Sequence, residues 1–307
     1  MQKVLVFGGS GFLGSHVADE LTRRGYIVTI FDRQPSYYLN NDQQMIVGNV
    51  LDRKAVDEAI GKVDIVYHFA AIADIQEARD NPVEAANFNI LGTMHILDSC
   101  RHHRIKRFVY SSTIYVYSDH GSFYRSTKQA CELFIENYKK EYGLNFTILR
   151  YGSLYGQRAN NFNFIRNSIV TALLEKKIER KGDGNEVRDY IHVLDAAISS
   201  VDILKEGFEN KYIMITGPQT MKVKELLSMI NEMLGNKINI QYQDEEFAGH
   251  YQITPYSFRP KVAEKIVPVR YHDLGQGILE CIYDIYEDLI AQGAKPEILY
   301  PSTKKNE

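Results

Sequence analysis

The chain has 307 residues, of which 44% are hydrophobic and 24% are charged, proportions typical of a globular protein with a sizeable core. Lys and Arg total 36 against 39 Asp and Glu, a net charge of -3, which argues against the basic field that a nucleic-acid partner requires. No apolar run approaches a membrane span, no signal-peptide pattern opens the chain, and the three cysteines are too far apart for a disulfide framework or a metal site. We expect a cytoplasmic α/β protein with no membrane or metal partner.

Short apolar runs alternate with helical patterns through the first half of the chain. Strands are predicted at 4–7, 27–31, 64–69, 108–111 and 146–149, with one more just before Gly48 and a helix over 16–24. The strands are continuously apolar rather than alternating, which indicates a parallel sheet covered on both faces. The expected fold is a Rossmann-type doubly wound α/β sheet with right-handed crossovers.

The second half of the chain is less regular. Helices are predicted over 164–176, 221–234 and 274–290. The segment 239–268 contains three prolines and shows no clear period. We expect 1–156 to form the Rossmann domain and 157–295 a smaller, partly interleaved substrate domain. Residues 296–307 are polar and charged, and we expect them to form a frayed tail.

A glycine-rich loop, Gly8-Gly9-Ser10-Gly11-Phe12-Leu13-Gly14, follows the first strand and opens the first helix. Glycines at this spacing permit a tight turn, close approach of the backbone to a pyrophosphate, and packing of helix on strand. The helix N-terminus then offers N–H groups to the phosphates. Asp32 ends the second strand, where a carboxylate accepts hydrogen bonds from the adenosine ribose and repels a 2′-phosphate. This pattern predicts NAD rather than NADP, although Arg33 next to the acid can soften the preference; a glycine-rich structural turn is the alternative.

Asn49 and Val50 follow the third predicted strand. Asn49 is placed to hydrogen-bond the adenine edge of the same cofactor. A simple polar turn is the alternative interpretation of these residues.

A tyrosine and a lysine four residues apart, Tyr124 and Lys128, lie at the start of a predicted helix and share one of its faces. A lysine cation beside a phenol lowers the phenol pKa and makes it a general base near neutral pH. Ser111-Ser112-Thr113 ends the strand before them, and one of these hydroxyls can share the substrate proton. A surface Tyr–Lys pair is the alternative, but the order of glycine loop, hydroxyl-rich strand end and Tyr–Lys pair favours an oxidoreductase.

Over about residues 2–235 these motifs resemble the extended short-chain dehydrogenase/reductase family, in its nucleotide-sugar epimerase/dehydratase branch. The motifs that carry the resemblance are Gly8–Gly14, Asp32, His68–Ala71, Asn89–Thr93, Ser111–Thr113 with Val116 and Tyr117, Tyr124–Lys128, Arg150 and Tyr151, Gly182–Gly184, and Arg188–Val193 with Asp195. The resemblance implies tightly bound NAD in the first domain and a nucleotide-diphosphate sugar in the second. It also implies a homodimer joined by a four-helix bundle of the helices near 84–102 and 124–142.

The resemblance also assigns roles to individual residues. Tyr124 is the base, Lys128 orients the cofactor ribose and tunes the tyrosine, and Thr113 holds the sugar hydroxyl. Arg188 matches a position that contacts substrate phosphate, and Asn163 matches an asparagine beside it. The implied cofactor contacts are Gly8, Gly11, Phe12, Leu13, Asp32, Arg33, Asn49, Val50, Phe69, Ala70, Ala71, Ser111, Tyr124, Lys128 and Tyr151.

Two departures from the family narrow the chemistry. Ile114 and Tyr115 stand where 4,6-dehydratases of the family usually carry an acid pair, and Ile114 also replaces the cysteine used by the GDP-fucose synthase type. What remains is oxidation at C4 of a UDP- or GDP-linked hexose or heptose, by a 4-epimerase or a 4-dehydrogenase, for surface polysaccharide synthesis. A 4,6-dehydratase with relocated acid and base, or a non-catalytic cofactor-binding member of the family, are the alternatives.

The loop over 118–123 is much shorter than the Pro-rich loop usual in the family. We expect a more open sugar site, compatible with a bulkier sugar such as a heptose or with release of the ketone. Gly152 and Ser153 also stand where the family often has an aromatic residue and an asparagine.

Overall fold

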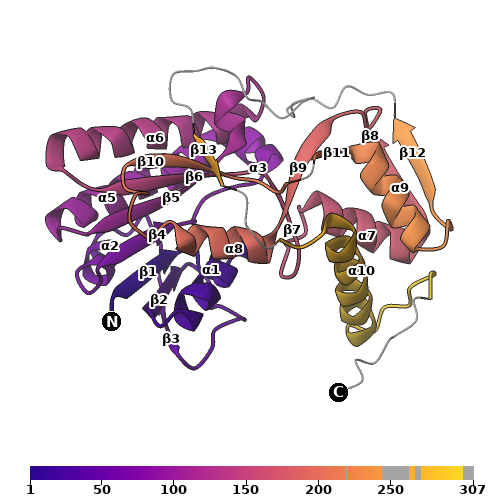
Figure 1. Ribbon diagram of the computed structural model, residues 1–307, viewed down its shortest axis with the longest axis horizontal. Coiled ribbons are helices and arrows are strands. Elements are labelled where there is room, and N and C mark those ends of the chain that lie inside the picture. Colours follow the sequence, from indigo (N-terminus) through magenta and orange to yellow (C-terminus); the bar gives the residue numbers. More distant parts are fainter. Residues whose placement is uncertain (219, 244–262, 267–270, 300–307) are drawn as a thin grey trace.

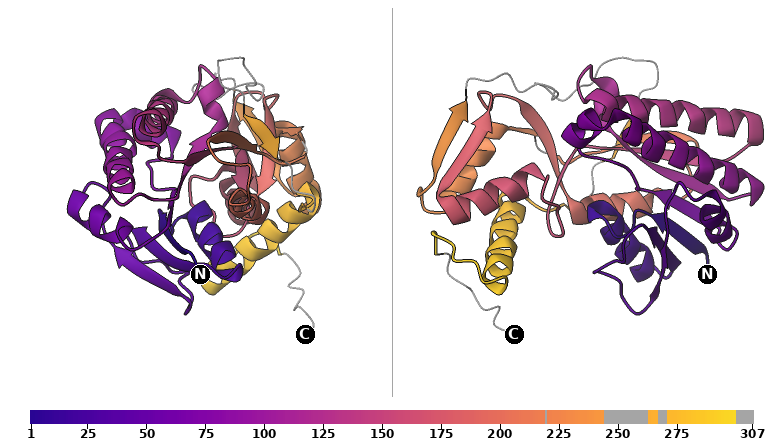
Figure 2. Two further views of the ribbon diagram at one scale, coloured as in Figure 1. Left: turned by 60° about the vertical axis from the view of Figure 1, so that its left-hand side comes forward. Right: turned by 180° about the vertical axis from the view of Figure 1, so that it is seen from behind.

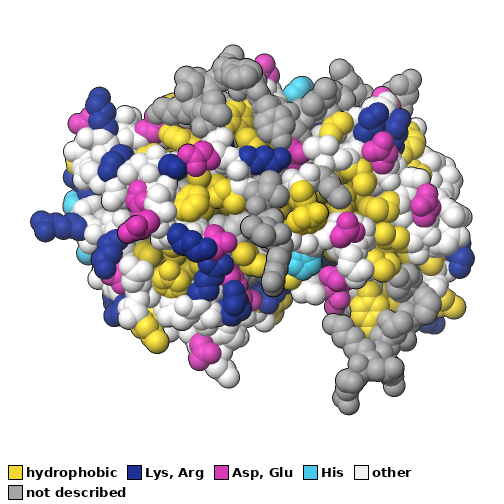
Figure 3. All heavy atoms as spheres, in the orientation of Figure 1, with side chains coloured by type: hydrophobic (Ala, Val, Ile, Leu, Met, Phe, Trp, Pro, Cys, Tyr) yellow, Lys and Arg dark blue, Asp and Glu magenta, His cyan; other side chains and the backbone are white. Residues whose placement is uncertain are grey.

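A computed structural model describes residues 1–218, 220–243, 263–266 and 271–299. Figure 1 shows a larger body built around a twisted sheet and a smaller body of helices and short strands beside it. In the described part of the chain, no helix is long and apolar enough to cross a membrane. Acidic and basic side chains are interspersed over the face seen in Figure 3, in keeping with the near-neutral charge.

The larger body contains an eight-stranded sheet in which all neighbouring strands are parallel. Its strands, from one edge to the other, are β13 (Glu264–Ile266), β10 (Lys211–Ile215), β6 (Phe146–Tyr151), β5 (Arg107–Thr113), β4 (Ile65–His68), β1 (Lys3–Phe7), β2 (Ile27–Asp32) and β3 (Gln43–Val47). The order reverses between β1 and β4, and ligands of doubly wound folds bind at the carboxyl ends of the strands at such a point. The predicted strands and parallel sheet are confirmed.

Helices cover both faces of this sheet. They are α1 (Phe12–Arg23), α2 (Arg53–Ile60), α3 (Ile75–Asp80), α4 (Pro82–Ala86), a π-helical turn η1 (Asn87–Leu91), α5 (Gly92–His102), α6 (Ser122–Tyr142) and α8 (Val193–Asp202), with a 3₁₀ turn η2 (Ile114–Tyr117) after β5. On β1, Val4 and Val6 pack with α1 and α8, whereas Leu5 and Phe7 pack with α2, α5 and α6. Burial on both faces explains why the strand is continuously apolar from Val4 to Phe7 rather than alternating.

The smaller body has its own hydrophobic core, formed by three helices and short strands. Its elements are β7 (Ser153–Tyr155), α7 (Phe164–Glu175), β8 (Lys177–Lys181), β9 (Val187–His192), β11 (Thr220–Lys222), α9 (Val223–Met233), β12 (Asn239–Gln243) and α10 (Leu274–Ala291). The chain crosses between the bodies more than once, because α8, β10 and β13 return to the large sheet. The domain boundary at residue 156 stays a prediction.

The expectation of a frayed tail is wrong for its first residues. Ile298 is buried in the core of the smaller body, and the backbone N–H groups of Glu297 and Ile298 donate to Leu173 O at 2.9 and 3.4 Å. Ile298 and the exposed Leu299 are too short an apolar run in a polar segment to give a periodic signal, so sequence reasoning missed this contact. Residues 300–307, and the segments 244–262 and 267–270, lie outside the described residues.

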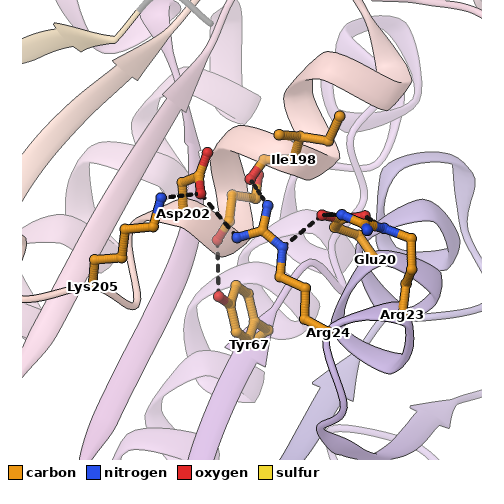
Figure 4. Close-up of polar contacts among 8 residues, drawn as sticks. Glu20, Arg23, Arg24, Tyr67, Ile198, Asp202 and Lys205 are labelled. Atoms are coloured by element: carbon orange, nitrogen blue, oxygen red, sulfur yellow. Dashed lines mark hydrogen bonds and ion pairs between the residues drawn. The ribbon is translucent and has the colours of Figure 1, made fainter. Parts of the chain in front are cut away.

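A polar network fastens α1 to α8 (Figure 4). Arg24, just after α1, donates to Glu20 at 2.6 Å, to Asp202 at 2.9 Å and to Ile198 O at 3.3 Å. On the adjoining turn of α8, Ser200 O accepts a hydrogen bond from the Tyr67 hydroxyl at 2.8 Å. The helix that opens after the glycine loop is therefore held by a helix from the second half of the chain.

Candidate active site

A cavity of about 1060 Å³ lies at the carboxyl ends of the central strands and reaches into the smaller body. Of the predicted site residues, Gly8, Gly11, Phe12, Leu13, Phe69, Ala71, Ser111, Thr113, Tyr124, Tyr151, Asn163 and Arg188 line it. The structure thus brings twelve of the predicted site residues, from all three groups, to one cavity. Their roles stay predictions, which the geometry below supports to different degrees.

The glycine loop has the shape that a bound diphosphate requires. Gly8 has φ +77°, and a Cβ there would lie 2.4 Å from Ala70 N, while a Cβ at Gly14 would lie 2.2 Å from Gly8 O. The first helical hydrogen bond runs from Ser15 N to Gly11 O at 3.0 Å, so the N–H groups of the first turn precede the helical ladder and face the cavity end of α1. These residues fit the pyrophosphate of a dinucleotide.

Asp32 closes β2 next to this loop. Its carboxylate accepts hydrogen bonds from Ser10 N at 3.1 Å and Gln34 N at 3.3 Å, which fixes it beside the loop and fits a ribose-binding acid. Arg33 points toward Phe88, with its guanidinium 5.9 Å from the ring centroid. Neither residue is among the described residues that line the cavity, so their contacts with the adenosine half of NAD stay predictions.

Asn49 and Val50 also lie outside that lining, after β3. Asn49 is exposed, and its side-chain carbonyl accepts a hydrogen bond from Leu51 N at 3.0 Å, which is a local turn. Val50 is buried against Gly92, where an added Cβ would lie 2.8 Å from the valine side chain. The structure shows the polar turn directly, and the adenine contact stays a prediction.

Thr113 and Tyr124 meet at the floor of the cavity. Thr113 is the last residue of β5, and Tyr124 lies in the first turn of α6. Burial raises the pKa of Tyr124 to about 12, and a hydrogen bond with the Thr113 side chain opposes this shift only in part. The prediction that the lysine brings this pKa near neutrality is wrong, because burial dominates.

Lys128 lies behind the tyrosine and is buried. Its Nζ donates to Ser111 O at 2.7 Å and sits 4.8 Å from the Tyr110 ring centroid and 5.8 Å from that of Tyr124. Burial lowers the Lys128 pKa to about 8, against the opposing charges of Cys131 and Glu132. The lysine is therefore mainly a cation at neutral pH, and its field acts on the tyrosine through the low-dielectric interior.

Asn89, which belongs to the Asn89–Thr93 motif, connects two segments that flank the site. It sits in the π-helical turn η1, and its side-chain amide exchanges hydrogen bonds with both backbone groups of Ile72, at 2.8 and 3.0 Å. The same amide donates to Thr127 Oγ1 at 3.0 Å, next to Lys128. A π-helical turn re-aims side chains within a helix and is frequent at functional sites. Asn89 thereby ties the loop after β4 to the helix that carries Tyr124.

The smaller body supplies the polar end of the cavity. Arg188 lines it from β9. Asn163 lines it too, but caps α7: its Oδ1 accepts from Arg166 N at 3.1 Å and its Nδ2 donates to Leu154 O at 2.9 Å. One N–H of its amide is left for a ligand, so its predicted substrate role is secondary to the cap. The N-terminus of α7 adds partial positive charge at this end.

Sequence reasoning missed several residues of the cavity. Arg180 on β8 forms a buried ion pair with Glu186, and its guanidinium lies 4.8 Å from the Phe164 ring centroid. Tyr190, Val223, and Gln76 and Arg79 of α3 also line the cavity. Tyr190 lies within the Arg188–Val193 motif but was given no role, and no motif marks the other positions, because the strands and helices that bring them together are far apart in the sequence.

The short loop 118–123 contributes to the cavity rim through residues 119–122. Gly121 has φ +95° and Ser122 has φ +49°, an unusual backbone for a serine. Arg125 Nη1 donates to Ser118 O at 2.7 Å and holds the loop. Its predicted effect on substrate size stays a prediction.

With this geometry in place, comparison with known proteins identifies the family. The pattern of the NAD dependent epimerase/dehydratase family matches residues 4–215. This span is more than half of the 307 residues, so the chain belongs to that family. Membership confirms the resemblance drawn from the motifs, the class of enzyme and the predicted cofactor, NAD.

Individual relatives agree on the class and differ in reaction. A putative UDP-glucose 4-epimerase of Methanocaldococcus jannaschii is 30% identical over 76% of this chain and 82% of its own. A UDP-N-acetyl-alpha-D-glucosaminuronate decarboxylase of Bacillus cytotoxicus is 28% identical over 76% of this chain and 80% of its own. The crystal structure of a UDP-glucuronic acid 4-epimerase from Bacillus cereus, with UDP-glucuronic acid and NAD, has a TM-score of 0.81 at 24% identity, covering 94% of this chain and 99% of that one. This likeness confirms the predicted Rossmann-type fold.

Proposed function

We propose that this protein oxidises C4 of a nucleotide-diphosphate sugar and reduces the ketone again, as an NAD-dependent 4-epimerase. The observation that carries the proposal is that Thr113 and Tyr124 line the same cavity as the glycine loop, with Lys128 buried behind the tyrosine. A phenol and a hydroxyl so placed can hold a sugar hydroxyl and move its proton. The kinship with a putative UDP-glucose 4-epimerase supports C4 as the reacting carbon.

In the proposed reaction the C4 hydroxyl binds between Thr113 and Tyr124. Tyr124 Oη takes the hydroxyl proton as the alcohol becomes a ketone, and returns a proton when the ketone is reduced. NAD, when bound along Gly8–Gly14, supplies the hydride chemistry. Lys128 Nζ lies 5.8 Å from the Tyr124 ring centroid, where a cation favours the phenolate, and it works against the burial that raises the tyrosine pKa.

The positions after Thr113 support epimerisation over elimination of water. Ile114 is buried and apolar, and Tyr115 lines the cavity with no carboxylate beside it in the chain. Loss of water from C5–C6 needs an acid and a base near those carbons, and neither residue supplies them. Arg188 and the α7 N-terminus are suited to the diphosphate.

Incubation with UDP-glucose and, separately, GDP-mannose tests the proposal. We expect the C4 epimer of one of them without net formation of NADH. Product that has lost one water would establish the 4,6-dehydratase instead, and an unchanged substrate with unchanged cofactor absorbance would favour the non-catalytic alternative. A 4-dehydrogenase, which the short rim loop 118–123 favours by easing release of a ketone, would accumulate NADH in step with product.

We also propose that the protein is a homodimer through α5 and α6, which lie side by side (Figure 2). Exposed apolar side chains on this part of the molecule, Val83, Leu91 and Leu133, would be buried in a four-helix bundle. Leu133, 61% exposed, is the most direct test.

We expect Leu133→Glu to halve the mass measured by sedimentation equilibrium, because a charge desolvated at the centre of an apolar interface is unfavourable. Leu39→Glu, at an exposed leucine in the loop before β3, is the control and should leave the mass unchanged. A monomeric wild-type protein, or a dimer that survives Leu133→Glu, would show that this face is not the interface.

A further inference from the structure

A buried carboxylate lies directly behind the proposed catalytic residues. Glu132 follows Lys128 by one helical turn on α6, and its side chain is 8% exposed. Its Oε1 accepts a hydrogen bond at 2.5 Å from the hydroxyl of Ser112, the residue before Thr113. Oε1 and Oε2 also accept hydrogen bonds from Arg150 Nε and Nη2 on β6, at 3.0 and 2.6 Å. One carboxylate therefore joins α6, β5 and β6 at the floor of the site.

Two contacts fasten α6 to the end of β5 at consecutive strand residues. Lys128 Nζ holds Ser111 O at 2.7 Å, and Glu132 holds the next residue. Tyr124 lies one turn before the lysine, and Thr113 is the residue that follows on the strand. The two contacts therefore fix the separation of the tyrosine and threonine hydroxyls. Chemistry of this kind is sensitive to such spacing, since a displacement of about 1 Å can cost about 10²-fold in rate.

Arg150 holds the carboxylate in a defined orientation. Its guanidinium also donates to the Tyr117 hydroxyl and lies 4.6 and 4.7 Å from the ring centroids of Tyr117 and Tyr212. Burial acts to lower the pKa of Arg150, but its bonds with Glu132 and Tyr117 outweigh this and raise it. Because desolvation offsets most of the attraction in a buried pair, the main physical effect of this pair is to fix geometry.

We propose that Glu132 is a positioning residue, which sets the Thr113–Tyr124 spacing through Ser112 and keeps a negative charge beside Lys128. The inference about turnover rests on the proposed function, whereas the inference about the lysine charge does not. The titratable groups that face the lysine are His68 on β4, Tyr110 on β5, and Tyr124, Cys131 and Glu132 on α6.

The negative charge of Glu132 beside Lys128 also affects how the stability of the protein depends on pH, and this effect can be measured without substrate. The Lys128 pKa is about 8 in the folded protein against a usual 10.5. Between these values the unfolded chain binds the proton more tightly, so stability rises with pH through this window. Glu132 raises the lysine pKa. Without its charge, the folded pKa falls further and the rise begins at a lower pH.

Glu132→Gln is the test, and Glu20→Gln is a matched control. Glu20 is equally buried, with a side chain 9% exposed, and pairs with Arg23 and Arg24 on α1, away from the described lining of the cavity. We measure kcat and KM on the nucleotide sugar, and the Tm, from pH 7 to 9.5. For Glu132→Gln we expect kcat to fall by about 10–100-fold with KM little changed, and the alkaline limb of kcat to move to lower pH. Glu20→Gln should keep the wild-type kcat even where its Tm falls.

Each outcome decides for or against the proposal. A wild-type kcat in Glu132→Gln, or an equal loss of kcat in Glu20→Gln, overturns it.

If Glu132→Gln does not fold, the double variant Glu132→Gln/Arg150→Met also removes the Arg150 cation that the first substitution leaves without its carboxylate. The kcat of the double variant must stay low, and full recovery overturns the proposal. If the wild type turns over no nucleotide sugar, the proposed function fails and the Tm decides. If the Tm of Glu132→Gln begins to rise at a lower pH than that of wild type, and this difference disappears when Lys128→Met is added to both proteins, the role of Glu132 is supported. An unchanged onset overturns it.

Discussion

Tyr124→Phe is expected to reduce turnover of the nucleotide sugar by about 10²–10⁴-fold, the usual contribution of a positioned general acid–base group. The substitution removes only the hydroxyl that pairs with Thr113. The ring itself packs against the small cluster of Ile72, Ala78 and Ala85, and phenylalanine preserves that packing. The fold and the NAD content should therefore be unchanged, and the whole effect should appear as a lower kcat.

The measurement is steady-state turnover, together with the NAD released on denaturing each purified variant. Tyr37→Phe, at a tyrosine that is almost fully exposed, is the control for loss of a phenolic hydroxyl and should behave as wild type. Undiminished turnover in Tyr124→Phe would remove the tyrosine from the reaction.

Gly14→Ala is expected to weaken NAD binding by about 10–100-fold, as overpacking costs about 1–3 kcal/mol. An added Cβ would lie 2.2 Å from Gly8 O and 3.1 Å from Gly9 Cα. Both atoms belong to the backbone, so the collision is relieved only by moving the loop away from the start of α1. The amides that would bind the pyrophosphate then lose their alignment.

Isothermal titration of the protein, freed of bound nucleotide, with NAD checks this result. Gly25→Ala is the matched control at the other end of the same helix. Gly25 has φ +84° with nothing within 4 Å of an added Cβ, so alanine there costs about 1–2 kcal/mol of stability from strain alone. Its affinity for NAD should equal that of wild type. Equal NAD affinity in Gly14→Ala would contradict a diphosphate site in this loop.

The sequence was sufficient to predict those parts of the fold that local pattern controls. β1 is apolar from Val4 to Phe7 because both of its faces are buried. The glycine loop is recognisable because its spacing follows from backbone contact between Gly8 and Gly14. The Tyr124–Lys128 spacing likewise placed both residues on one helix. These features depend on neighbours in the chain.

What the sequence could not provide depends on burial and on distant partners. The pKa of Tyr124 is governed by desolvation, which the spacing of a lysine does not reveal. Glu132 lies four residues after Lys128, a visible spacing, but its partners Ser112 and Arg150 come from other strands. Ile298 packs into a core that includes α7, a helix more than a hundred residues earlier in the chain. Such contacts exist only once the chain is folded.

The central claim is that hydrogen leaves C4 of the sugar as hydride and returns to the same carbon. UDP-glucose deuterated at C4 tests it most directly, with the product analysed by mass and by NMR. The account predicts a product of inverted configuration at C4 that still carries deuterium at C4, with no label in the solvent. An inverted product that has exchanged its deuterium for solvent hydrogen would contradict it.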